Sequence, residues 1–236
     1  TTPPDPACAI GSVRQRLAQL LLVGLDPVDT TTAQALLSRP ERPGGIFVGG
    51  NPTAIFRDLP QLTERYRPIV AVDEEGGRVQ RIDTLRGPLP SAAEQAQWTP
   101  EKLRAEIEKR GRQLAELGVT MDFAPVVDLD SPGPGRVIGD RSFGTDPTEV
   151  VQDARVFIEG LLAGGLIPTL KHFPGHGRAE GDTHKVSTST PPWSDLLERD
   201  LVPFRELAGG HRDIAVMTAH VQIPGLTGEL PASLAR

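Results

Sequence analysis

The sequence predicts an α/β fold, specifically a TIM-type (β/α)8 barrel that is truncated after about six strand–helix units. Apolar, β-rich runs alternate with stretches of helical period, a pattern typical of a parallel sheet buried on both faces. Polar residues stand at the carboxyl ends of several of these runs, where parallel α/β folds place their ligand sites. No glycine fingerprint of the dinucleotide-binding type follows the first run, so a barrel is favoured over a doubly wound sheet.

The first half of the chain supplies three predicted strands. Residues 19–25 form an apolar run, and a short helical segment that ends near Leu37 follows them. The run Gly-Ile-Phe-Val-Gly at 45–49 predicts the second strand, and a stretch of helical period covers about 52–66. The run Pro-Ile-Val-Ala-Val-Asp at 68–73 predicts the third strand.

The second half combines longer helices with three further strands. Helices over about 100–117 and 147–163 each begin at a proline, a residue favoured in the first helical turn. They lead to apolar runs at 119–128 and 166–173. A last helix near 194–207 precedes the strand predicted at 214–221. Because a complete barrel has eight units and usually about 250 residues or more, we expect it to be incomplete at the C-terminus.

Composition limits the kinds of partner. The 236 residues are 38% hydrophobic and carry a net charge of -6 without a block of like charge. This balance argues against a nucleic-acid or anionic-membrane surface and favours a neutral or small ligand. The histidines lack the spacing of a zinc site, so we expect neither a metal nor a cofactor. The only cysteine, Cys8, has no base beside it and is not a catalytic candidate.

Residues 1–11 read as an extended Pro/Thr-rich tail ahead of a catalytic barrel over residues 12–236. The opening Thr-Thr-Pro-Pro-Asp-Pro lacks an initiating Met, from which we expect a processed or trimmed chain. No apolar run approaches the roughly 20 residues of a membrane span, so anchoring to a membrane is expected only through this tail. We expect an exported protein of the cell envelope or the extracellular space, with a cytoplasmic location as the alternative. The sequence does not predict the oligomeric state.

Residues 170–185 read as an active-site loop, because three histidines, two lysines, three glycines and two acids follow an apolar run. Asp182 and His184 stand two residues apart in this polar segment, where a carboxylate can orient an imidazole and raise its basicity. We predict that this pair is the catalytic acid/base. The alternative is that His172 and His176 satisfy local backbone groups and that Asp182 starts a turn.

Four predicted strands direct polar side chains to one place. Asp73, Asp128, the pair Lys171 and His172, and His220 each lie at or just past the carboxyl end of a strand. Because these ends meet at one rim of a barrel, we expect a shared ligand site there.

Five motifs stand out along the chain: Val72-Asp-Glu-Glu-Gly-Gly-Arg-Val-Gln-Arg81, Asp140-Arg-Ser-Phe-Gly144, Lys171-His-Phe-Pro-Gly-His-Gly177, Asp182-Thr-His184 and Val216-Met-Thr-Ala-His-Val221. In sequence and order they resemble glycoside hydrolase family 3, and within it the single-domain β-N-acetylglucosaminidase (NagZ-type) branch. The likeness covers essentially everything after the tail. One departure is Glu74, which stands where glutamine is usual.

The resemblance implies a role for each matching residue. Asp73 would hold sugar hydroxyls, and Arg141, Lys171 and His172 would line the same subsite. His184 would protonate the leaving oxygen, paired with Asp182. Simpler roles remain open: Asp73 could cap the Glu-Glu-Gly-Gly turn, and Arg141 could pair with Asp140. His176 and His220 are weaker candidates.

The implied activity is that of a retaining exo-β-N-acetylglucosaminidase, which removes terminal N-acetylglucosamine from cell-wall, peptidoglycan-derived saccharides. The alternatives are a β-N-acetylglucosaminide phosphorylase, a β-glucosidase and a catalytically inactive sugar-binding fragment. The family's nucleophile is an aspartate in a short motif on the seventh strand, and no aspartate before Arg236 lies in a matching motif. The nucleophile is therefore unassigned and expected beyond Arg236, and we expect this chain to be inactive by itself.

Overall fold

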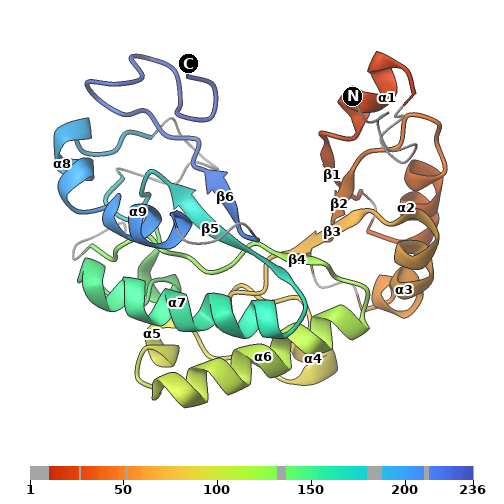
Figure 1. Cartoon of the computed structure of the whole chain (residues 1–236), viewed down its shortest axis with the longest axis horizontal. Helices are drawn as coiled ribbons and strands as arrows, with labels where there is room; N and C mark the ends of the chain where they lie inside the picture. Colours follow the sequence, from red (N-terminus) through yellow and green to blue (C-terminus); the bar gives the residue numbers. More distant parts are fainter. Residues whose placement is uncertain are drawn as a thin grey trace, which may run out of the picture.

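A computed structural model describes residues 11–26, 28–50, 53–131, 137–179, 188–209 and 213–235 of the chain, and six parallel strands form one curved sheet within them (Figure 1). The strands are β1 (Leu22–Gly24), β2 (Gly45–Phe47), β3 (Ile69–Val72), β4 (Met121–Asp122), β5 (Ile167–Phe173) and β6 (Ala215–Thr218). They pair in sequence order, each with the next. This half-barrel confirms the predicted fold class.

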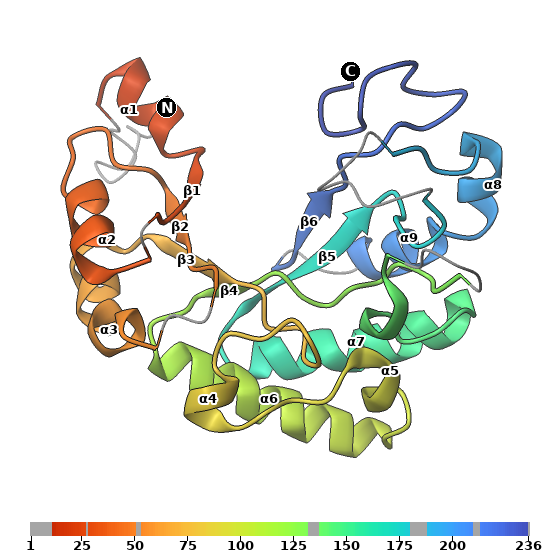
Figure 2. The same ribbon diagram turned by 180° about the vertical axis from the view of Figure 1, so that it is seen from behind.

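Helices cover the outside of the curved sheet. They are α1 (Val13–Ala18), α2 (Thr30–Leu37), α3 (Ile55–Tyr66), α4 (Asp83–Arg86), α5 (Ala92–Gln95), α6 (Pro100–Glu116), α7 (Pro147–Ala163), α8 (Trp193–Glu198), α9 (Val202–Ala208) and the 3-10 turn η2 (Gly139–Arg141). Helices α2 and α3 lie beside the first strands, α6 and α7 run along the base, and α9 lies beside β5 (Figures 1 and 2). The edge strands β1 and β6 stand apart.

The long helices begin where their sequences provide caps. Thr99 accepts the amide hydrogen of Lys102 at the start of α6, and Asp146 accepts those of Thr148 and Glu149 at the start of α7. A proline follows each cap, which removes one amide that would otherwise lack a partner. These local signals explain why both helices begin at the residue predicted from the sequence.

Helices α6 and α7 pack closely through small residues. A Cβ atom on Gly160 would come within 2.8 Å of the Ile107 side chain, and one on Gly164 within 2.7 Å of Gly111. Glycine at these positions therefore lets the two helices approach. The core beneath the sheet is continuous and apolar; its fully buried members include Ile46, Val70, Val72, Ile107, Leu114, Phe157, Ile158 and Leu170.

Two predicted elements differ from the structure. The run 119–128 gives only the two-residue strand β4, because Pro125 interrupts the ladder and lacks an amide donor; pairing with β5 resumes at Val126. The single helix predicted near 194–207 is two helices, α8 and α9. Pro203 fits the first turn of α9, whereas inside one long helix its ring would clash with the preceding turn.

None of the helices in the described part of the chain combines the length and apolar character needed to cross a membrane.

Candidate active site

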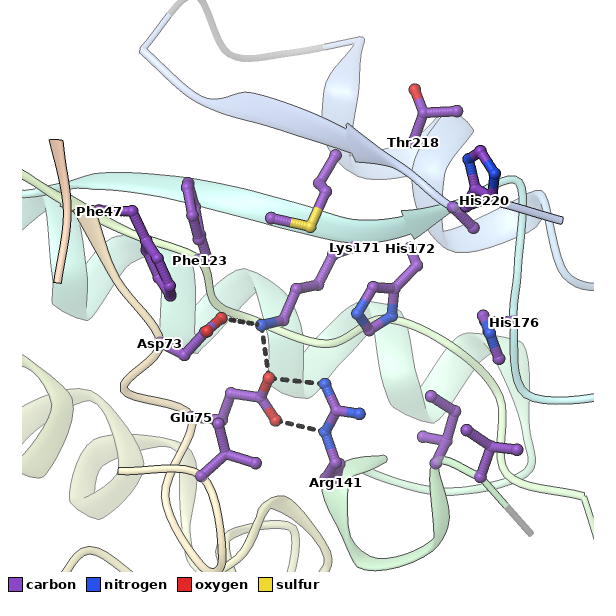
Figure 3. A pocket seen from close by; sticks show the side chains of 15 residues that line it. Phe47, Asp73, Glu75, Phe123, Arg141, Lys171, His172, His176, Thr218 and His220 are labelled. Carbon is purple, nitrogen blue, oxygen red and sulfur yellow. Dashed lines mark hydrogen bonds and ion pairs between the residues drawn. The ribbon is translucent and has the colours of Figure 1, made fainter. Parts of the chain in front are cut away.

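A cavity of about 450 Å³ lies at the carboxyl ends of the strands (Figure 3). Half of its polar lining residues were placed at strand ends from the sequence. The lining consists of Phe47, Asp73, Glu75, Val79, Phe123, Val137, Ile138, Arg141, Lys171, His172, His176, Met217, Thr218, Ala219 and His220. The structure therefore brings together the four predicted sugar-binding residues: Asp73, Arg141, Lys171 and His172.

Lys171 is the centre of the charged cluster. It lies on β5 and is only 1% exposed, so its ammonium group depends on nearby carboxylates for stabilisation. Its Nζ lies 2.8 Å from Oδ1 of Asp73 and 2.5 Å from Oε1 of Glu75. Both acids follow β3, so one lysine joins the rim segments of β3 and β5 across the intervening β4.

Glu75 also binds Arg141, which ends the turn η2. The guanidinium donates from Nε to Oε2 at 2.7 Å and from Nη2 to Oε1 at 2.8 Å, which is the two-point geometry typical of strong Arg–carboxylate pairs. Burial alone would raise the pKa of Glu75, but Lys171 and Arg141 outweigh it and hold the pKa at about 2. Glu75 is therefore ionised at neutral pH.

His172 is oriented by Asp128. Its Nδ1 lies 2.6 Å from Oδ2 of Asp128, whose Oδ1 accepts the backbone amides of His172 and His176. Burial raises the pKa of Asp128, but the contacts with His172 and these amides lower it overall. A fully buried carboxylate with this many donors fixes the imidazole ring in one orientation.

A bulge in β5 explains why both Lys171 and His172 reach the cavity. Lys171 pairs with Met217 and Phe173 with Thr218, so β5 has one more residue here than β6. Neighbouring side chains of a regular strand point to opposite faces, and a bulge redirects one of them.

The alternative roles considered for two of these residues do not match the contacts. Asp73 pairs with Lys171 and lies 3.5 Å from Nη2 of Arg81. Arg141 pairs with Glu75, whereas Asp140 pairs with Arg78 at 2.9 Å. Inside the cavity, Asp73 thus pairs with Lys171 instead of capping a helix, and Arg141 pairs with Glu75 instead of with Asp140.

The two weaker candidates also line the cavity. His176 is 4% exposed, its ring contacts that of His172 edge to face at 5.8 Å, and burial lowers its pKa. His220 follows β6 and shares a hydrogen bond with Oγ of Ser233, 2.6 Å from its Nδ1. Both histidines therefore border the space between the charged cluster and β6.

Asp182 and His184, the predicted acid/base pair, lie outside the described residues. The described residues on either side of them make contacts with later parts of the chain. Before them, Arg178 pairs with the buried Asp200 through Nε at 3.1 Å. After them, Ser189 pairs with Gln222 beyond β6.

Sequence reasoning missed several features of the cavity. Glu75 was seen only as part of a turn. Arg81, which contacts Asp73 without lining the cavity itself, was seen only as part of a motif. Phe47 and Phe123 form a stacked pair with ring centres 5.6 Å apart on the wall beside Asp73 (Figure 3). The signal for Glu75 was its spacing of two from Asp73, which places both side chains on the same side of the chain.

Within the described ranges, no group of three or more His, Cys, Asp or Glu side chains is placed to hold a metal ion.

Comparison with known proteins gives consistent results. Residues 12–236 match the model of the glycosyl hydrolase family 3 N-terminal domain. The β-hexosaminidase LpqI of Mycobacterium tuberculosis is 46% identical in an alignment of 235 residues that covers 97% of this chain. A β-hexosaminidase of Hydrogenovibrio crunogenus is 38% identical over 181 residues, covering 71% of this chain and 48% of that protein. The chain spans about 60% of the length of LpqI.

Two solved structures show the same architecture. A glycosyl hydrolase family 3 member from Mycobacterium smegmatis superposes with a TM-score of 0.88 at 43% identity, over 96% of this chain and 69% of that one. NagZ from Neisseria gonorrhoeae, solved with N-trifluoroacetyl-D-glucosamine, superposes with a TM-score of 0.78 at 32% identity, over 90% of this chain and 66% of that one.

Proposed function

Because the chain belongs to glycosyl hydrolase family 3, we propose that the intact protein is a retaining exo-β-N-acetylglucosaminidase. Its proposed substrates are cell-wall, peptidoglycan-derived saccharides that end in N-acetylglucosamine. The names of the similar proteins, β-hexosaminidases and a NagZ studied with an N-acylated glucosamine analogue, support this substrate class. They do not favour a phosphorylase, a β-glucosidase or an inactive binding fragment.

The observation that carries the proposal is the cluster formed by Asp73, Glu75, Arg141 and Lys171. Its carboxylates and cations are joined at 2.5–2.8 Å and line one cavity. Such a cluster offers acceptors and donors at fixed positions, as a pyranose with hydroxyls on successive carbons requires. We infer that Asp73 accepts from sugar hydroxyls, while Lys171, Arg141 and His172 donate to them.

Catalysis would combine this subsite with Asp182 and His184. We infer that His184 gives a proton to the leaving oxygen and then takes one from the attacking water, with Asp182 orienting its ring. The imidazolium form gives the first proton, and the neutral imidazole that remains takes the second. Because an imidazole titrates near neutral pH, it does not need the raised pKa that a carboxylic acid needs. A retaining reaction also needs a nucleophile. No aspartate of this sequence is assigned to that role, so the purified 236-residue chain is expected to bind sugar without turnover.

Turnover of an aryl β-N-acetylglucosaminide tests the proposed acid/base. In the intact protein, His184→Ala is expected to lower kcat at least 100-fold, since general acid–base help contributes about 100- to 10,000-fold. His211→Ala, outside the 170–185 segment, is the matched control and should retain parent activity. A His184→Ala protein within threefold of the parent would rule out this assignment.

We also propose an exported protein that works in the cell envelope, where peptidoglycan fragments are present, with the segment 1–11 as a tether. Fractionation of cells that produce the intact protein tests this location. Recovery of all the protein from the cytoplasmic fraction would contradict it.

A further inference from the structure

Glu74 points away from the cavity, although both of its neighbours reach into it. Its side chain is completely buried. One carboxylate oxygen, Oε2, accepts the backbone amide of Arg81 at 2.6 Å and that of Ile82 at 3.3 Å. A single buried carboxylate therefore joins the two ends of the segment that runs from Asp73 to Ile82.

Arg110 of α6 provides the opposite charge. Its Nη1 lies 3.4 Å from Oε1 of Glu74, and its Nη2 donates to the carbonyl oxygen of Gly87 at 2.7 Å. Burial raises the pKa of Glu74 and lowers that of Arg110, so each charge is costly alone and is stabilised by the other. Burial also raises the pKa of nearby Asp122 well above its usual range. Asp122 accepts the backbone amide of Glu74 at 2.9 Å, whereas Arg110 lies within ion-pair distance of the Glu74 carboxylate.

The segment closed by Glu74 carries much of the sugar subsite. Arg81, whose amide Glu74 holds, places Nη2 3.5 Å from Oδ2 of Asp73. The amide of Glu75 donates to the carbonyl of Val79 at 3.0 Å, and the carbonyl of Glu75 accepts from Nε2 of Gln95 at 3.1 Å. The backbone that carries Asp73 and Glu75 toward Lys171 is therefore held by hydrogen bonds to Glu74, Val79 and Gln95.

We propose that Glu74 is a positioning residue for the sugar subsite, and that Arg110 is its required counter-charge. The carboxylate holds the 73–82 segment closed, which fixes the two acids at hydrogen-bonding distance from Lys171. Glutamine, the residue usual here in the resembling family motif, also has an oxygen that can accept both amides. This role rests on the proposed function, because the group being positioned is the proposed sugar site.

Three variants of the intact protein test the acceptor and its charge separately. Glu74→Leu removes the acceptor and is expected to raise KM for the aryl N-acetylglucosaminide at least tenfold. Glu74→Gln keeps an acceptor oxygen and should hold KM within threefold of the parent. Glu74→Gln also leaves Arg110 without its main counter-charge, so the Tm of this variant should fall by roughly 10 °C. Glu74→Gln combined with Arg110→Met should keep the low KM and recover most of that Tm.

Glu94 supplies a matched control. Its exposed carboxylate also accepts a backbone amide, that of Ser91 at 3.0 Å, but it does not line the cavity. Glu94→Leu should therefore leave KM unchanged. A purely structural role for Glu74 would lower the Tm of Glu74→Leu without moving the KM of its folded fraction, and that result would overturn the proposal.

Hydrogen exchange at the Arg81 and Ile82 amides gives a readout that does not depend on glycosidase activity. Glu74→Leu should accelerate exchange at both amides at least tenfold, and Glu74→Gln should not. Unchanged exchange in Glu74→Leu refutes the inference whether or not the protein cleaves the substrate. If Glu74→Leu does not fold, a raised KM in Glu74→Gln with Arg110→Met refutes it instead. The His184→Ala result tests the proposed function and does not bear on the role of Glu74.

Discussion

Replacing Glu75 with glutamine should destabilise the protein by about 3 kcal/mol at neutral pH. Lys171 and Arg141 lower the pKa of this buried carboxyl from 4.5 to about 2. Each pKa unit corresponds to about 1.4 kcal/mol of preference for the ionised form, which gives this magnitude. It also lies at the lower end of the roughly 3–5 kcal/mol lost when one partner of a buried ion pair is removed.

The pH dependence of this difference is the sharper test. Because the folded-state pKa is depressed, the contribution of Glu75 is fully present above pH 4.5 and is lost as the pH falls toward 2. Urea unfolding of the parent and of Glu75→Gln, followed by tryptophan fluorescence, should therefore show a difference that is constant from pH 7 to 5 and shrinks below pH 4.5.

Glu206 of α9 is the matched control, since it is exposed. Glu206→Gln should change the unfolding free energy by less than about 0.5 kcal/mol. The reasoning fails if Glu75→Gln costs less than about 1 kcal/mol at pH 7. It also fails if the difference is the same at pH 7 and pH 3, because a packing defect would not titrate.

Two further changes test the cavity and its support. Asp128→Asn places an amide donor against Nδ1 of His172 in place of the carboxylate oxygen at 2.6 Å, so calorimetry should show N-acetylglucosamine binding at least tenfold weaker; equal affinity would exclude a role for this contact. Gly177→Ala would bring a Cβ within 1.7 Å of the Leu129 carbonyl oxygen, and we expect thermal unfolding to show a loss of at least about 2 kcal/mol. Gly144→Ala, with no atom within 4 Å of its Cβ, should stay near the parent, and equal stability of both alanine variants would contradict the packing described here.

The parts of the fold that the sequence predicted are those with local signals. Helix α7 spans Pro147–Ala163, the residues predicted from its helical period and its initial proline; the structure adds Asp146 as the cap. Strands β3 and β5 were predicted within two residues because each is a continuous apolar run. The break between α8 and α9 was missed because apolar residues continue at helical spacing on both sides of it, although Pro203 is a signal for the start of a new helix.

The candidate site was predicted less completely because its pairs join distant residues. The strand-end rule placed Asp73, Lys171 and His172 at one rim, since it depends only on the direction of the strands. The partner of Arg141 could not be predicted in this way, because Glu75 and Asp140 are both acids and only the fold brings Glu75 within 2.8 Å. The sequence showed that Glu74 stands where glutamine is usual in the family motif. That its side chain is buried away from the cavity depends on the turn that follows β3 and could not be predicted.

The charges of the cavity explain why a neutral sugar suits it better than an ionic ligand. Asp73 and Glu75 are paired with Lys171 and Arg141 at 2.5–2.8 Å, so each of these four groups already has an opposite charge beside it. Fixed, mutually compensated groups still present strong donors and acceptors to hydroxyls, and they need no counter-ion to be displaced. We therefore expect binding of N-acetylglucosamine to depend weakly on salt. A fall in affinity of more than threefold between 0.05 and 0.5 M sodium chloride would indicate an uncompensated charge and contradict this view of the site.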